Sequence, residues 1–119
     1  MRPGRGAFVQ VFVAVPSSRQ ATRIATRLLQ LELCACAQTL GPMRSHYRWR
    51  GKLQHAREWL LLLKTRTVLL SDVEREIRRL HPHAVPEILA HAVTHGSAAY
   101  LDWLQHECAS GRVASRRSK

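Results

Sequence analysis

Short apolar runs of strand length alternate with longer segments of helical spacing along the chain. Residues 8–15 are apolar and rich in β-branched side chains, which predicts a strand that ends at Pro16. Ser17 and Gln20 then form an S-x-x-Q capping box, which predicts the start of an amphipathic helix. The apolar positions that share one face of this helix are Ala21, Ile24, Ala25, Leu28 and Leu31. The first two elements are therefore a strand and a helix that packs on a sheet.

The rest of the pattern predicts two strands, a helix and another strand. Residues 33–40 and 43–49 are strand-like on either side of a bend at Gly41-Pro42. A turn at 50–52 leads into the strand 57–65, and apolar residues on both its faces are expected of a strand covered on both sides. The remaining predicted elements are a helix from about residue 68 to 80, a strand at 88–93 and a last helix at 98–106.

This order is β-α-β-β-α-β with an extra C-terminal helix, and it predicts an α+β, ferredoxin-like sandwich with a long central hairpin. We expect one domain at residues 7–108. Residues 1–6 and 109–119 are rich in Gly, Ser and Arg and lack apolar periodicity. They are therefore predicted to be a flexible N-terminal tail and a flexible basic C-terminal tail.

Composition narrows the class of protein. The 119 residues include 19 Lys and Arg against 8 Asp and Glu, a net charge of +11, and part of the excess lies in the two terminal segments. We interpret this charge as a solvated basic surface. The sequence shows neither a secretory signal nor an apolar run of the roughly 20 residues that a membrane span needs, so a cytoplasmic protein without a membrane partner is expected. Three cysteines, an odd number, argue against a disulfide framework.

Six short motifs in succession resemble those of CutA proteins. They span about residues 8–106 and read Val15-Pro16-Ser17, Leu33-Cys34-Ala35-Cys36-Ala37-Gln38, Arg44-Ser45-His46-Tyr47-Arg48-Trp49-Arg50-Gly51-Lys52, Lys64-Thr65-Arg66, His81-Pro82-His83-Ala84-Val85-Pro86-Glu87-Ile88 and Tyr100-Leu101-Asp102-Trp103. The resemblance implies a ferredoxin-like fold, a tightly packed homotrimer and a role in tolerance of copper and other divalent ions.

The residues also favour an oligomer independently of the resemblance. The hairpin at 43–65 is long and carries Tyr47, Trp49 and Trp59. A bare apolar edge of this length would invite aggregation, and a trimer would pair each edge with a neighbour. The alternative is a monomer that covers its own hairpin.

His81 is the first candidate metal ligand. In relatives with a copper site, the ligands are a cysteine late in the first strand and two adjacent histidines, and the matching positions here hold Val13, Leu80 and His81. One imidazole binds copper weakly, and the alternative role of His81 is to bond the last carbonyls of a helix. His83 lies two residues on, so in extended backbone the two imidazoles could chelate one ion. Copper or another divalent cation is thus the expected ligand, not required for folding, although exposed loop histidines are the interpretation we favour for the pair.

Two further groups of residues are candidates for binding. Cys34 and Cys36 form C-x-C, whose thiols suit a soft metal, although packing in the core is the interpretation we favour. A ligand site in clefts between subunits is predicted at Trp49, Glu58, Lys64, Arg66 and Glu87.

No catalytic motif is recognisable in the sequence, so a non-catalytic metal-binding homotrimer is the expected function. The alternative is a basic module for nucleic acid or small anionic ligands on the same trimer. An RNA-binding sheet would need exposed aromatic residues on its central strands, whereas residues 60–63 are all leucine. Nucleic acid is therefore not the partner we expect.

Overall fold

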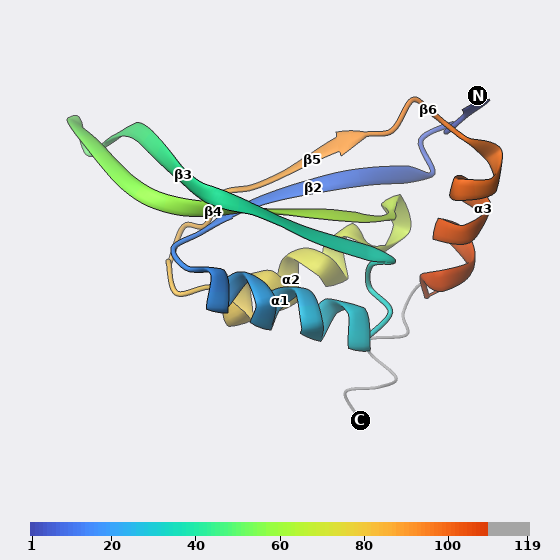
Figure 1. Ribbon diagram of the computed structural model, residues 1–119, viewed down its shortest axis with the longest axis horizontal. Helices are drawn as coiled ribbons and strands as arrows, with labels where there is room; N and C mark the ends of the chain where they lie inside the picture. The colour runs from blue at the N-terminus through green and yellow to red at the C-terminus, as the bar shows by residue number, and fades with distance from the viewer. Residues whose placement is uncertain (110–119) are drawn as a thin grey trace.

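The computed structural model describes residues 1–109, in which a four-stranded antiparallel sheet carries two helices on one face (Figure 1). The main elements are β2 (Phe8–Val15), α1 (Ser18–Gln30), β3 (Cys36–Trp49), β4 (Lys52–Arg66), α2 (Leu70–Leu80), β5 (Ile88–Ala92) and α3 (Ala98–Glu107). The sheet order is β3-β4-β2-β5, which is the ferredoxin-like order. The predicted fold class is confirmed. Of the predicted basic tail, residues 110–119 lie outside the described part of the chain.

The N-terminal segment differs from the predicted flexible tail at 1–6. Arg2–Pro3 forms a short strand, β1, that pairs antiparallel with β6 (His95–Gly96). The next residue, Gly4, donates its N–H to the carbonyl of Thr94 at 2.6 Å. These are backbone bonds, which need no apolar side chains, and this is why the hydrophobic pattern does not reveal them.

The helices begin as their sequences predict. The Ser17 hydroxyl accepts a hydrogen bond from the backbone N–H of Gln20 at 3.1 Å and caps α1. A 3₁₀ turn, η1 (Thr67–Leu69), precedes α2. Both helices bury their apolar face against alternate residues of the two central strands. The core of this layer consists of Val9, Val11, Val13, Val15, Ala21, Ile24, Leu28, Leu61, Leu63, Val73 and Ile77.

Neither α1 nor α2 lies over the other face of the sheet (Figure 1), and the strand register places apolar side chains on that face. Phe12 lies between its cross-strand partners Leu62 and Leu89. We call this surface the open sheet face, and it comprises Phe12, Leu40, Leu60, Leu62 and Leu89. Two of its members, Leu40 and Leu89, are 59% and 54% exposed. The prediction that strand 57–65 is covered on both sides therefore holds for one face only in a single chain.

The β3–β4 hairpin extends well beyond the helices (Figure 1). The two predicted strands 33–40 and 43–49 are one strand, in which the pairing register shifts at Gly41-Pro42. A Cβ atom on Gly41 would lie 2.5 Å from Cδ1 of Trp59, so only glycine lets the two strands approach here. Arg50 and Gly51, with φ of 52° and 80°, close the hairpin with the left-handed pair that a tight two-residue turn requires.

Candidate functional site

A pocket of about 870 Å³ opens between the hairpin and the loop that follows α2. We call it the hairpin pocket. Its polar and aromatic lining comprises Ser45, His46, Tyr47, Trp49, Arg50, Glu58, His83 and Glu87. Imidazoles, carboxylates and aromatic rings thus meet in one concave site, which is the composition expected of a ligand pocket.

Four residues predicted as candidates come together in the hairpin pocket. Trp49 comes from β3, Glu58 from β4, and His83 and Glu87 from the loop before β5. Sequence reasoning does not single out His46, which also lines this pocket. The place of His46 at the pocket depends on how β3 pairs with β4 in the hairpin, and a single sequence does not show this pairing directly.

Lys64 and Arg66, the other two predicted cleft residues, do not reach this pocket. They lie six and eight residues beyond Glu58 on β4, roughly 20 Å or more along an extended strand. The Lys64 ammonium donates to the side-chain oxygen of Gln38, and Arg66 donates to the carbonyl of Ala109 at 3.0 Å. Both cations therefore have structural partners at the opposite end of the sheet.

His81 is buried, with 7% of its surface exposed, and both of its ring nitrogens are engaged. The backbone N–H of His83 donates to Nδ1 at 3.1 Å. Nδ1 must therefore be unprotonated, so Nε2 carries the proton and donates it to the carbonyl of Ala14 at 2.8 Å. His81 ties the loop after α2 to β2. A metal ion on this imidazole would have to displace one of these bonds.

The predicted His81–His83 chelate would therefore require His81 to give up one of its two hydrogen bonds. The two rings are close, with centroids 5.0 Å apart, but of the two residues only His83 lines the hairpin pocket. Within residues 1–109, no group of three or more His, Cys, Asp or Glu side chains is arranged to hold a metal ion. A metal-binding site in the hairpin pocket would accordingly need ligands beyond those of one chain's described residues.

The two candidate thiols have different surroundings. Cys34 is 2% exposed, and burial, with smaller contributions from the nearby thiols of Cys108 and Cys36, raises its pKa from the ordinary 9.0 to about 12. It stays protonated at neutral pH, whereas soft metals bind the thiolate. Cys36 is half-buried at the start of β3. The structure thus supports a packing role for Cys34.

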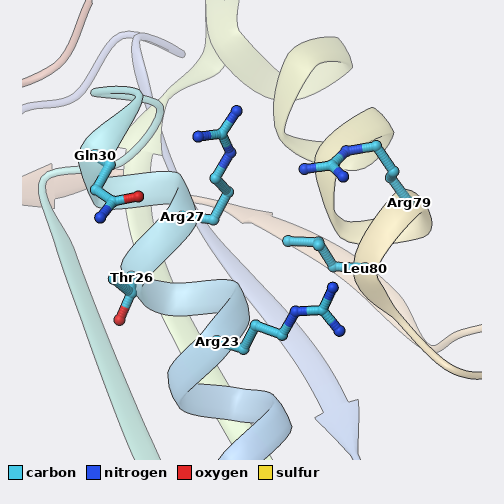
Figure 2. Close-up of a pocket in the computed structure, with 6 residues that line it drawn as sticks. All are labelled: Arg23, Thr26, Arg27, Gln30, Arg79 and Leu80. Carbon is cyan, nitrogen blue, oxygen red and sulfur yellow. The ribbon is translucent and has the colours of Figure 1, made fainter.

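A second pocket, of about 450 Å³, lies between α1 and α2 (Figure 2). It is lined by Arg23, Thr26, Arg27, Gln30, Arg79 and Leu80. Sequence reasoning interprets the positive charge of the chain only as a solvated basic surface. It misses this pocket because Arg79 approaches from another helix, and single-helix periodicity does not show which residues of a second helix lie opposite.

Comparison with known proteins gives a consistent result. The family model described as "CutA1 divalent ion tolerance protein" matches residues 9–107. The "Divalent-cation tolerance protein CutA" of Thermus thermophilus is 39% identical over 95 residues, which cover 80% of this chain and 92% of that protein. The chloroplastic CutA of Arabidopsis thaliana is 36% identical over 98 residues, 82% of this chain but 54% of that protein.

Solved structures agree with the sequence matches. The divalent cation tolerance protein of Thermus thermophilus superposes with a TM-score of 0.84 at 36% identity, covering 86% of this chain and 99% of that chain. CutA1 of Oryza sativa gives a TM-score of 0.86 at 31% identity, covering 88% and 96%. No helix within residues 1–109 is both long and apolar enough to cross a membrane.

Proposed function

Because the chain belongs to the CutA1 divalent ion tolerance protein family, we propose that it acts in divalent-ion tolerance as a non-catalytic, metal-binding homotrimer. The observation that carries this proposal is the open sheet face beside the hairpin pocket. Burial of the apolar face would favour assembly. The pocket offers imidazole and carboxylate groups as metal ligands, but the described residues of one chain do not place three of them together.

The open sheet face is expected to be buried against another surface. Phe12, Leu60 and Leu62 are half-buried on the central strands and adjoin the more exposed Leu40 and Leu89 on the edge strands, which gives a contiguous apolar surface across the sheet. Burying such a surface is favourable by about 25 cal/mol for each Å² removed from water. A ring of three identical chains covers it without leaving a free copy of the interface.

In this proposal the hairpin pocket lies at the boundary between subunits. Ala14 lines the pocket, and its cross-strand partner Leu60 belongs to the open sheet face. A neighbour that covers this face would therefore also border the pocket and bring further donors to it. His83, Glu58 and Glu87 supply imidazole and carboxylate groups, which suit Cu²⁺ and Zn²⁺.

A Cu²⁺ titration of the purified protein, at a measured oligomeric mass, tests the proposal. We expect saturable binding that weakens about tenfold or more in His83→Ala, because one imidazole ligand is lost. His106→Ala is the matched control, since this exposed histidine of α3 lies outside the hairpin pocket. His81→Gln is expected to lower stability while leaving the stoichiometry unchanged, because its ring nitrogens already hold structural bonds.

Two results would contradict the proposed site. One is the absence of saturable binding of both Cu²⁺ and Zn²⁺ by the assembled protein. The other is equal loss of affinity in His83→Ala and His106→Ala, which would indicate binding by surface histidines in general.

A further inference from the structure

The pocket between α1 and α2 gathers positive charge in one place. Figure 2 shows the guanidinium groups of Arg27 and Arg79 facing the space between the helices, with Arg23 entering one turn earlier along α1. Leu80 projects from α2 toward α1 between them. We call this site the arginine cleft. It combines three cations with the polar side chains of its other lining residues and an apolar floor.

Glu76 holds two of the three arginines in place. Its carboxylate accepts hydrogen bonds from Arg79, Nη2 to Oε1 at 2.8 Å and Nε to Oε2 at 3.4 Å. Across the cleft, Nε of Arg27 lies 3.6 Å from Oε1 of the same carboxylate. The Glu76 side chain is 15% exposed, so it lies beneath the guanidinium groups and fixes their direction. An arginine fork held by a carboxylate still has N–H donors for another acceptor.

Arg23 is the third cation, and it has no hydrogen bond or ion pair with residues 1–109. α1 contains no acidic residue that could balance it. Three arginines against the single carboxylate of Glu76 leave a local excess of two positive charges. That excess matches a dianion.

We propose that the arginine cleft binds a phosphate dianion, either free or as the phosphate group of a small molecule. Planar guanidinium forks match the geometry of phosphate oxygens and bind them through paired, charge-assisted hydrogen bonds. Leu80 offers an apolar contact to the organic part of an ester. The cleft lies on the helical layer, opposite the open sheet face, so assembly through that face leaves it accessible (Figure 1).

A titration with inorganic phosphate and with phenyl phosphate, at ionic strength held constant with NaCl, tests the inference. The readout is the NMR signals of the arginine Nε–H groups. We expect saturable shifts, and an affinity about tenfold lower in Arg23→Gln, which removes one charged donor group. Glu76→Gln is expected to raise the affinity, because it removes the negative charge and keeps an acceptor for Arg79.

Arg19→Gln is the matched control, because Arg19 is an exposed arginine of the same helix that does not line the cleft. Its affinity should equal that of the parent, and thermal unfolding should show that all variants are folded. Tighter binding of phenyl phosphate than of inorganic phosphate would identify esters as the ligand class, and the reverse would identify the free ion. Equal weakening in Arg19→Gln and Arg23→Gln, or shifts that never saturate, would each overturn the inference.

Discussion

Two buried side chains, Thr65 and His81, connect segments that are far apart in the sequence. The Thr65 hydroxyl is fully buried and donates to the carbonyl of Leu33 at 2.7 Å, which joins β4 to the segment before β3. His81 joins the end of α2 to β2 through the carbonyl of Ala14. Each buries polar atoms and satisfies them with specific hydrogen-bond partners inside the protein, which is the condition under which buried polar residues stabilise a fold.

Replacing Thr65 by valine keeps the shape of the side chain and removes the donor. The carbonyl of Leu33 then loses this partner inside the core, and we expect the free energy of unfolding to fall by about 1–3 kcal/mol. Urea denaturation measures this change. Thr39→Val, at an exposed position of β3, is the control and should change stability by no more than about 0.5 kcal/mol. Equal effects of the two variants would contradict the assigned role of the bond.

The buried thiol of Cys34 predicts a loss of stability in alkali. Its pKa is about 12 in the folded protein against an ordinary 9.0, so the unfolded chain releases this proton first as the pH rises. The contribution of Cys34 is complete below pH 9 and declines between pH 9 and about 12. Unfolding measured over this range should show a shallower decline in Cys34→Ala. Identical slopes for parent and variant would contradict the prediction.

At the scale of elements, the sequence predicts the helices and the strands of the main sheet. It predicts only in part how the segments between and beyond them pair. Apolar spacing and the Ser17 cap predict α1 because both signals are local. The β1–β6 pair escapes prediction because it consists of backbone bonds between the two ends of the domain. The register shift at Gly41-Pro42 looks like a bend in the sequence, since a single sequence does not show that pairing resumes beyond it with the same partner strand.

The close approach of the hairpin strands predicts that Gly41→Ala is destabilising. The new methyl group would meet the Trp59 ring and force the ring or the strand to move, at a cost of about 1–3 kcal/mol. Thermal unfolding measures the effect. Gly51→Asn is the control, because Gly51 has open space around its Cα and asparagine tolerates its left-handed conformation. A Gly41→Ala protein as stable as Gly51→Asn would contradict the close approach.

At the scale of the whole molecule, the sequence predicts the candidate site only where the loop after α2 meets the hairpin. His83, Glu58 and Glu87 converge there from separate parts of the chain. Within one chain Lys64 does not join them, because strand geometry places it at the far end of β4, and its place in a cleft between subunits stays a prediction. The arginine cleft escapes prediction, because it depends on how two helices pack side by side.

The open sheet face links the fold to the proposed function, because assembly through it would cover the apolar strands and complete the hairpin pocket. Leu62 is near its centre, paired with Phe12 and Gln38. A lysine at this position would place a charge in the proposed interface, so we expect Leu62→Lys to dissociate the assembly. Val68→Lys is the control, because Val68 is 63% exposed on η1, away from the open sheet face.

Native mass spectrometry of the parent and these two variants tests the central claim most directly. We predict three times the 13.6 kDa chain mass for the parent and for Val68→Lys, and a single chain mass for Leu62→Lys. A parent protein that remains at one chain mass across the concentrations at which it is folded would contradict the claim. So would a trimer that Leu62→Lys leaves intact, because the open sheet face would then not be the interface.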